Sequence, residues 1–361
     1  MRALNVPLLI TALLIVAPSY GEEGFLSNKV WSNIKLPSWW PQLVGAQITV
    51  IPQHLFPFHS PYEGERSLLP REDTRASHTY GFYLGSQITE NLQGYFDVEM
   101  FKGGAVSKAN GLGGLTNMDV LRSGGGFGVI HPNDPYIARG YIRYLFPLSD
   151  EREPVEQDQD QVAGLEPIYR LEFKLGKMSP NDDFDRNRYA NSPRFQFTNW
   201  SLVTNTAWDF AADTRGYSIG TVLGWVEPNW DIKLGLFQIP RIANGYNLDP
   251  DVLRDRGNNL QFTYRPDGSQ GASYRFMGYL NTARMGRYNA AIANAQATGG
   301  TPDIRADDHP GRVKYGFAFN MDYPLADDGE TGVFARWGWN DGAPKVSLTP
   351  RWIASGAWVA S

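Results

Sequence analysis

The sequence predicts an all-β fold class, a transmembrane antiparallel β-barrel of the outer-membrane type. Three features of the 361-residue chain lead to this prediction. Apolar and polar residues alternate with a period of two in about eleven stretches. Charged residues keep to one face of these stretches, and short turns alternate with long polar connections. Most stretches approach the roughly 9 to 11 residues that a tilted bilayer-spanning strand needs, whereas soluble strands average about 5 to 6.

The chain begins with the features of a secretory signal peptide. Arg2 gives a short basic region, the run from Leu4 to Ala17 is apolar, and small residues follow at Ser19 and Gly21. No later stretch has about 18 consecutive apolar residues, so we expect no helical membrane anchor. The predicted organisation is a signal peptide at 1–22, a periplasmic N-terminal segment at 23–42, a β-barrel domain at 43–342 and a divergent tail at 343–361.

The composition argues against several classes of protein. The formal net charge is −5 and the basic residues are scattered, so the chain has no basic stripe for nucleic acid. It contains no cysteine, which suits an extracytoplasmic protein that does not use disulfides. No catalytic, cofactor-binding or metal-ligand pattern stands out, and we expect neither an enzyme nor a bound cofactor or metal.

The clearest predicted strand is 313–323. Phe317 and Phe319 point to one of its faces, and Lys314 and Asp322 point to the other. A charge that faced lipid at the membrane midplane would cost roughly 2 to 4 kcal/mol, so this segregation indicates a lipid-facing apolar surface. The other predicted strands are 46–53, 78–88, 92–102, 136–146, 168–177, 216–226, 230–239, 259–265, 272–282 and 331–340.

The connections between these strands are sorted by length. In outer-membrane barrels the periplasmic turns are short and the external loops are long, and this asymmetry has no reason to arise in a soluble sandwich. The one exception is the acidic stretch 147–166, which falls on the short side. The short turns are 89–91, 227–229, 266–271 and 324–330, and the long segments are 54–77, 103–135, 178–215, 240–257 and 283–311.

The predicted strand 331–340 carries tryptophan on one face and arginine on the other. Trp337 and Trp339 alternate with Arg336. A half-buried strand of a soluble β domain would show the same alternation, so this stretch alone does not decide. With the sorted connections, we predict that Trp337 and Trp339 lie in the outer aromatic girdle and that Arg336 faces a water-filled lumen.

Several segments resemble the carbohydrate-selective porin family of the OprB type. The resemblance covers most of 43–342, and it implies an outer-membrane barrel of 16 strands that passes sugars, with inward-folded loops that narrow the pore. On this resemblance the domain at 43–342 is an incomplete porin domain. The matching segments are "GAQITVIPQHLFPFHSPYEGERSL" (45–68), "YFDVEMFKG" (95–103), "LGKM" (175–178), "FDRNRYANSPRFQFTNW" (184–200) and "KYGFAFNMDYPL" with "GVFARWGWNDG" (314–342).

The chain departs from this family after Gly342. The tail "APKVSLTPRWIASGAWVAS" lacks good alternation and the terminal aromatic strand with which such barrels close. Bacterial single-chain barrels have even strand numbers, so an odd count near eleven leaves an unpaired edge. Unsatisfied backbone groups at such an edge cost several kcal/mol each in lipid. We therefore expect a truncated or frame-shifted chain that lacks about five strands relative to the family's barrel.

The lumen-facing residues are candidates for contact with a sugar. A sugar is neutral and rich in hydroxyls and has an apolar C–H face, so a selective pore needs paired donors and acceptors beside an aromatic surface. The same charges would also suit salt-bridge ladders of the wall, such as Arg139 with Glu99 or Arg170 with Glu172. The candidates are Asp97, Glu99, Arg139, Arg143, Arg170, Glu172, Arg194, Trp200, Arg336 and Asn340.

The long segments 103–135 and 178–215 are the expected constriction elements. The first is rich in glycine and can fold into a lumen at little steric cost, or remain an external loop. The second carries Arg194 and Trp200. The Trp200 ring suits stacking on a pyranose, although an aromatic packed under its own loop is at least as common.

The resulting prediction is passive, substrate-selective diffusion of sugars through a polar barrel lumen in the bacterial outer membrane. Expected partners are mono- or oligosaccharides, outer-membrane lipid and the barrel-assembly machinery, with no nucleic acid. One alternative is a barrel that exports a polysaccharide. Another is a soluble secreted carbohydrate-active enzyme with Asp97 and Glu99 as paired carboxylates, roughly 6 to 7 Å apart at Cα. The apolar face and the sorted connections weigh against the enzyme.

Overall fold

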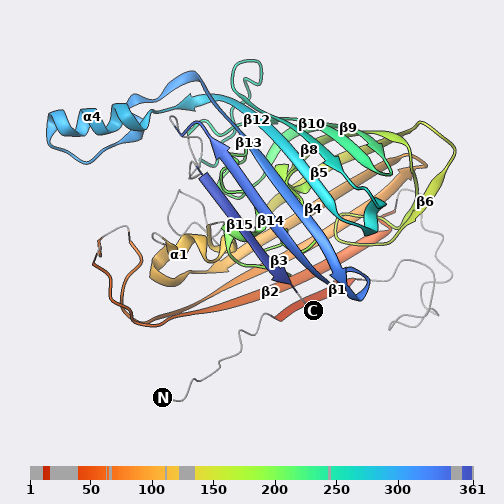
Figure 1. The fold of residues 1–361 in the computed structure, drawn as a ribbon, viewed down its shortest axis with the longest axis horizontal. Coiled ribbons are helices and arrows are strands. Elements are labelled where there is room, and N and C mark those ends of the chain that lie inside the picture. Colours follow the sequence, from red (N-terminus) through yellow and green to blue (C-terminus); the bar gives the residue numbers. More distant parts are fainter. Residues whose placement is uncertain are drawn as a thin grey trace, which may run out of the picture.

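One curved antiparallel sheet contains most of the residues that the structure describes (Figure 1). In the described part, this sheet has 13 strands. Strands that are neighbours in the sheet are also consecutive in the chain, with one exception. β5 pairs with β8, because the short hairpin of β6 and β7 lies between them in sequence and forms a separate two-stranded sheet. The computed structural model describes residues 11–16, 40–61, 63–64, 67–109, 112–121, 135–242, 245–342 and 352–359.

Every stretch that the sequence predicted as a strand is a strand of this sheet. Several strands extend beyond the predicted limits, because the ladder continues where the alternation of side chains fades. The strands are β2 (Leu43–Leu55), β3 (Asp73–Thr89), β4 (Leu92–Gly103), β5 (Tyr136–Pro147), β8 (Arg170–Met178), β9 (Ser218–Glu227), β10 (Trp230–Gln238), β11 (Arg256–Tyr264), β12 (Ser273–Met285), β13 (His309–Ala326) and β14 (Thr331–Asn340).

Two further strands lie at the ends of the sheet. β1 (Thr11–Val16) pairs with β2, and β15 (Trp352–Val359) pairs with β14. The sequence predicted neither, because both lie in segments without a period-two pattern, and backbone pairing to a free strand edge does not require that pattern. β1 falls within the predicted signal peptide and β15 within the predicted divergent tail, most of whose residues lie outside the described part. The signal peptide and the domain limits remain predictions.

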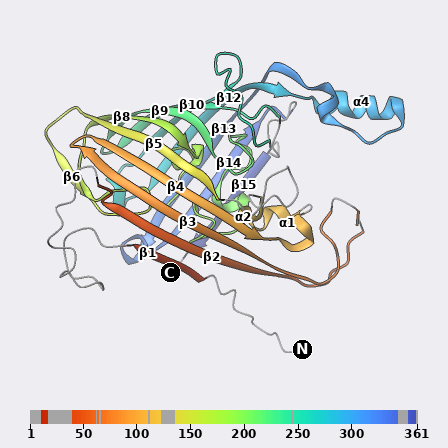
Figure 2. The same ribbon diagram turned by 180° about the vertical axis from the view of Figure 1, so that it is seen from behind.

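The described sheet is an open wall. Its terminal strands, β1 and β15, pair with β2 and β14 and not with each other in the residues that the structure describes. Figure 2 shows the wall from behind, with β1 and β2 along one edge. The sheet therefore has the antiparallel, sequential order of a membrane barrel without the pairing that closes one.

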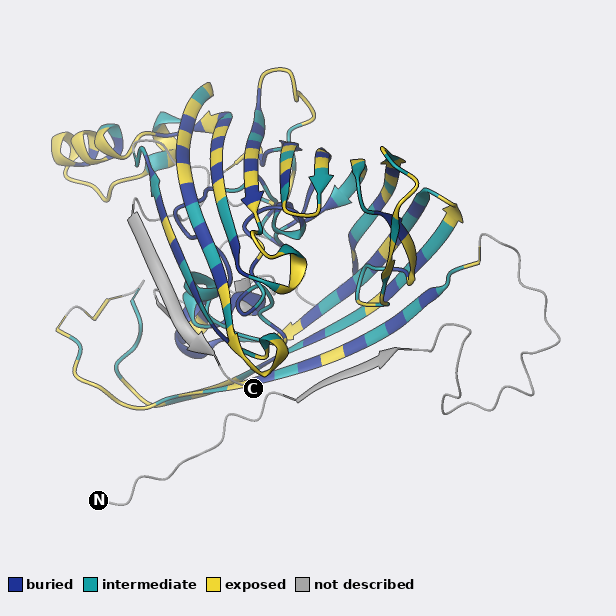
Figure 3. Cartoon of the chain, turned by 45° about the vertical axis from the view of Figure 1, so that its right-hand side comes forward, coloured by how far each residue is buried: buried dark blue, intermediate teal, exposed yellow. Residues whose placement is uncertain are grey.

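The two faces of the wall differ in burial, and Figure 3 shows buried and exposed residues alternating along the strands. Phe317 and Phe96 point outward and are 45% and 40% exposed. Lys314 and Asp97 point inward and are 1% and 0% exposed, although both are charged. On the outer face the rings of Phe317 and Trp337 lie 5.4 Å apart at their centroids. The predicted inward and outward sides of β4 and β13 are confirmed, whereas Ala138 of β5, expected on the outer face, is buried at a register shift beside β4.

Helices are few and short in the described chain. No helix there is long and apolar enough to cross a membrane. The longest, α4 (Tyr288–Thr298), lies on an arm between β12 and β13 that projects from one end of the sheet in Figures 1 and 2. The others are α1 (Leu112–Leu115), α2 (Met118–Leu121), α3 (Trp200–Val203) and the 3-10 turns η1 (Val106–Ala109), η2 (Pro180–Asp182), η3 (Gly268–Gln270), η4 (Ile304–Asp307) and η5 (Asp327–Gly329).

Connections fold against the concave inner face of the wall and bury it. The segment 179–217, between β8 and β9, is the longest of these and is called the long loop below. Phe184 and Trp208 from the long loop pack with Phe237 of β10 in a buried apolar cluster. The inner face of the wall therefore meets packed protein over much of its area.

Candidate functional site

Buried polar contacts attach the long loop to the inner face of β13 and β14. Arg336 of β14 pairs with Asp185, Nε to Oδ2, at 3.1 Å, and donates to the carbonyls of Asp185 and Ala190 at 3.0 and 2.7 Å. Asn320 of β13 donates to Asp185 Oδ1 at 2.7 Å, and Asn340 donates to the carbonyl of Ala207 at 3.0 Å. Each inward polar side chain thus satisfies a backbone or carboxylate group of the loop.

The other side of the long loop contacts β4. Arg194 Nη1 lies 2.8 Å from Glu99 Oε1, and Arg194 Nε lies 3.7 Å from Asp119 of α2. Burial alone would lower the pKa of Arg194, but the carboxylates of Glu99 and Asp119 outweigh it and raise that pKa well above its usual value. The loop therefore bridges the interior from β13 and β14 to β4.

A hairpin enters the same interior from the end of the short turns. It consists of β6 (Arg152–Val155), β7 (Gly164–Pro167) and the tip between them, and is called the inner hairpin below. Val162 is buried at 3% exposure, and its N–H donates to the hydroxyl of Tyr95 at 3.2 Å. The sequence placed the acidic stretch 147–166 among the short connections, and the structure turns much of it inward.

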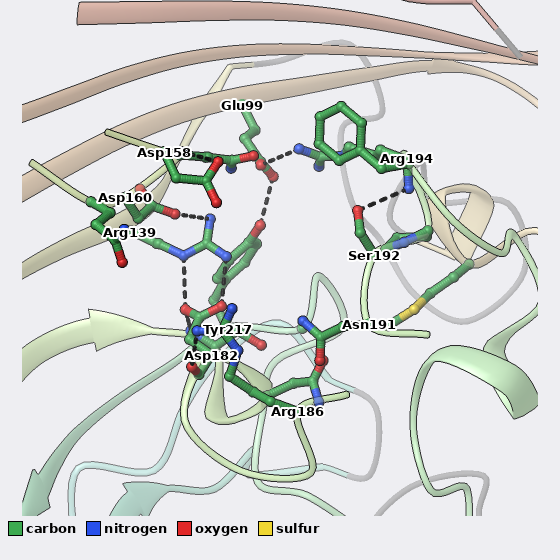
Figure 4. A pocket seen from close by; sticks show the side chains of 18 of the residues that line it. Glu99, Arg139, Asp158, Asp160, Asp182, Arg186, Asn191, Ser192, Arg194 and Tyr217 are labelled. Atoms are coloured by element: carbon green, nitrogen blue, oxygen red, sulfur yellow. Dashed lines mark hydrogen bonds and ion pairs between the residues drawn. The ribbon is translucent and has the colours of Figure 1, made fainter. Parts of the chain in front are cut away.

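A cavity of about 270 Å³ lies between the long loop, the inner hairpin, β4 and β5 (Figure 4). Its rim also carries aromatic rings, among them Tyr141, Tyr217 and Phe195. The charged residues that line the cavity are balanced in sign: Arg139, Lys174, Arg186 and Arg194 are basic, and Glu99, Asp158, Asp160 and Asp182 are acidic.

Arg139 pairs with three carboxylates at this cavity. Its guanidinium lies 3.1 Å from Asp97, 3.4 Å from Asp160 and 2.7 Å from Asp182. These carboxylates come from β4, the inner hairpin and the long loop. Burial raises the pKa of Asp160, and the positive charge of Arg139 opposes that rise. One arginine therefore joins the wall to both inward-folded segments.

Glu99 is held by hydrogen bonds as well as by Arg194. The hydroxyls of Tyr217 and Tyr136 donate to Glu99 Oε2 at 2.7 and 3.0 Å. Together with Arg194, these donors fix the direction of the carboxylate.

Asp183 joins the start of the long loop to two strands. Lys174 Nζ and Lys233 Nζ lie 2.8 and 2.9 Å from Asp183 Oδ1. Burial alone would raise the pKa of Asp183, but the two ammonium groups outweigh it and hold that pKa at about 2. This carboxylate stays ionised at neutral pH and fixes the loop beside the cavity.

The predicted site residues fall into four groups. Glu99, Arg139 and Arg194 line the cavity, and Asp97 lies directly behind Arg139. Trp200 begins α3 and is not among the residues that line this cavity. Arg336 and Asn340 point inward as expected, yet the long loop covers them, so Arg336 does not face water. Arg143, Arg170 and Glu172 do not line the cavity; they form a cluster with Glu166 of the inner hairpin, and Glu172 links it to the cavity residue Lys174 at 3.6 Å.

The expected wall pairs are partly observed. Arg170 lies 3.7 Å from Glu172, and this is one of the two ion pairs that were expected in the wall. Arg139 pairs with Asp97, its neighbour in register across β4 and β5, and Glu99 pairs with Arg194 of the loop. A register shift between Asp97 and Val98 changes which inward residues of β4 and β5 face one another.

Sequence reasoning missed Asp158, Asp160, Asp182 and Tyr217 as cavity residues, whereas Arg186 belongs to the loop expected to form a constriction. All four missed residues lie in connections, where no periodicity tells which way a side chain points. One signal was available for the inner hairpin, because 147–166 was the exception to the sorting of connections by length.

A wall of antiparallel strands with an apolar outer face, charged inner face and inward-folded loops defines an outer-membrane porin. The carbohydrate-selective porin family, OprB, matches residues 168–356, which is more than half of the chain, and the chain belongs to that family. The bacterial outer membrane is therefore its location.

A solved structure of a porin from this family supports the same fold. The high-pH structure of Pseudomonas putida OprB is similar with a TM-score of 0.55 and 12% identity, over 84% of this chain and 67% of that one. Salmonella typhi OmpF, in a complex with daunomycin, has a TM-score of 0.34 and 9% identity, over 84% of this chain and 83% of that one. No curated protein matches the chain.

Proposed function

We propose that this porin gives passive, substrate-selective diffusion of sugars, and that the cavity between the long loop and the inner hairpin is where a sugar is recognised. The supporting observation is the balance of charge at this cavity, with four basic and four acidic side chains beside aromatic rings. Balanced charges bind hydroxyls of a neutral molecule without strongly attracting ions of either sign. The tyrosine and phenylalanine rings offer a surface for the C–H face of a pyranose.

Selectivity of this kind depends on a fixed geometry and not on a chemical step. Glu99, Arg139 and Arg194 form the part of the cavity that contacts sugar hydroxyls in this proposal. Their ion pairs hold their polar atoms in place, so little conformational freedom is lost when a sugar arrives. Transport also requires that each contact be weak, and side chains that are already paired give weak additional hydrogen bonds.

The remaining predicted site residues have supporting roles in this proposal. Arg143, Arg170 and Glu172 anchor the inner hairpin, whereas Arg336 and Asn340 anchor the long loop. The outer apolar face meets outer-membrane lipid, and insertion depends on the barrel-assembly machinery, as for other proteins of this architecture.

Liposome swelling tests this function with the full chain. Vesicles that contain the protein are diluted into isotonic solutions of a neutral hexose or of an amino acid of smaller size, and the swelling rates are compared. We expect faster entry of the hexose than its size alone predicts. An amino acid that enters faster than the hexose by the margin that its smaller size predicts would contradict substrate selectivity. Vesicles that swell in neither solution would contradict diffusion.

A further inference from the structure

The charged residues at the cavity divide into paired and unpaired groups. Arg139, Lys174 and Arg194 each form ion pairs with carboxylates of the wall or the loop. In the described part of the chain, Asp158 and Arg186 form none. The Asp158 carboxylate accepts the backbone N–H of Gln159 at 2.7 Å, and the Arg186 guanidinium donates to a backbone carbonyl at 3.5 Å. Both side chains are exposed, so their charges are available to a molecule in the cavity.

These two residues reach the cavity on different segments of the chain. Asp158 lies at the tip of the inner hairpin, and Arg186 lies on the long loop. Figure 4 shows them on opposite sides of the cavity. A carboxylate and a guanidinium that are set apart and unpaired offer acceptors on one side and donors on the other.

The inner hairpin extends far from the end at which it enters. At its base Arg152 pairs with Glu90 at the turn between β3 and β4, Nη2 to Oε1, at 2.6 Å. At its tip Asp160 pairs with Arg139, which is eight residues from the end of β5 at Pro147 and hence about 26 Å along the strand. The hairpin therefore carries charge from the short-turn end deep into the wall's interior.

The tip that carries Asp158 has a defined conformation. Asp158 and Gln161 exchange two backbone hydrogen bonds of 3.1 Å, which close a two-residue turn. Asp160 adopts the left-handed region in this turn, with φ 58°, which aspartate tolerates better than most residues. Burial of Val162 then fixes the turn against the wall. Asp158 is consequently held at the cavity and is not a side chain of a free loop.

We propose that Asp158 and Arg186 are the residues that set selectivity for neutral sugars over sugar acids. This inference rests on the proposed function and names its substrate class. Hydroxyls of a neutral sugar donate to the Asp158 carboxylate and accept from Arg186, and charged hydrogen bonds of this kind are roughly twice as strong as neutral ones. The carboxylate of a uronate is attracted by Arg186 and repelled by Asp158. The net attraction is therefore small and does not offset the loss of the water that hydrates this carboxylate.

Current blockade in planar bilayers tests the proposal on the full chain. The concentrations of D-glucose and of D-glucuronate that halve the current are measured for the wild type, Asp158→Asn and Arg186→Gln. We expect Asp158→Asn to raise the glucose value about tenfold and to lower the glucuronate value, because one charged hydrogen bond and one repulsion are lost. Arg186→Gln should raise both values.

Glu156→Gln is the matched control. Glu156 is exposed on the same hairpin, carries the same charge and does not line the cavity. We expect this variant to retain both wild-type values. Equal shifts in Glu156→Gln and Asp158→Asn would overturn the proposal, because they would show a diffuse effect of charge.

The outcomes also separate this inference from the function on which it rests. A wild-type current that responds to neither sugar would contradict the proposed function. A wild-type current blocked by glucose, with Asp158→Asn and Arg186→Gln indistinguishable from it, would leave the function standing and overturn the selectivity roles. All three substitutions are on exposed side chains, so unfolding is not expected to obscure the result.

Discussion

Arg336 of β14 and Asp185 of the long loop form an ion pair of 3.1 Å in which neither side chain is more than 1% exposed. The arginine also donates to three carbonyls, those of Asp185, Ala190 and Leu202. An inward charge of the wall thus serves to hold a loop across the interior. The position of the cavity depends on this attachment, because the same loop carries Arg186 and Arg194.

Removal of Arg336 should loosen the long loop. Arg336→Met leaves the Asp185 carboxylate buried without its cation, which typically costs about 3 to 5 kcal/mol. We expect a lower unfolding temperature in detergent and a larger, noisier single-channel current. The double variant Arg336→Met with Asp185→Asn should be less destabilised than the single variant, because the unpaired charge is gone. A double variant at least as unstable as the single one would argue against an electrostatic attachment.

Substitution of two glycines tests whether the long loop packs directly on β14. A Cβ on Gly338 would lie 2.4 Å from Oδ1 of Asn205, whereas a Cβ on Gly278 of β12 would meet nothing within 4 Å. Gly338→Val should therefore displace the loop and cost about 1 to 3 kcal/mol. Gly278→Val should have little effect. Thermal unfolding measures both, and similar stability of the two variants would contradict the close approach.

Acid should weaken the attachment at Asp183. The pKa of Asp183 is depressed to about 2 in the folded chain, below its ordinary value of 3.8, so the carboxylate stabilises the fold above about pH 4. That contribution, of about 2 kcal/mol, is lost as the pH falls from 4 to 2. We expect Asp183→Asn to be less stable than the wild type at pH 6 and to approach it near pH 2. A stability difference that does not change with pH would contradict this account.

A charged side chain on the outer face should reduce insertion into a membrane. Phe317 points outward on β13, and lysine near the membrane midplane on a lipid-facing site costs roughly 2 to 4 kcal/mol. We expect Phe317→Lys to reduce insertion into liposomes, measured as the protease-protected fraction, and Phe317→Leu to retain it. Undiminished insertion of Phe317→Lys would show that this face does not contact lipid.

The alternation of side chains made the wall predictable. The sequence of a strand such as 313–323 indicates which side chains lie on its inner face and which on its outer face. Successive side chains of a strand point to opposite sides whatever lies around them. The same local rule placed Asp97, Glu99, Arg139 and Arg336 on the inner side. The resemblance of the segments around 184–200 and 314–342 to known porins then indicated the family.

The sequence by itself determined for most strand residues which face inward and which face lipid, since that follows from a period of two; Ala138, beside a register shift, is an exception. Only the tertiary structure decided what each inward residue meets. Arg336 and Asn340 are covered by the long loop, whereas Glu99, Arg139 and Arg194 border a cavity to which an acidic hairpin contributes Asp158 and Asp160. These contacts join segments far apart in the chain, and the loops that make them have no periodic pattern, so their positions depend on packing and ion pairing across the whole interior.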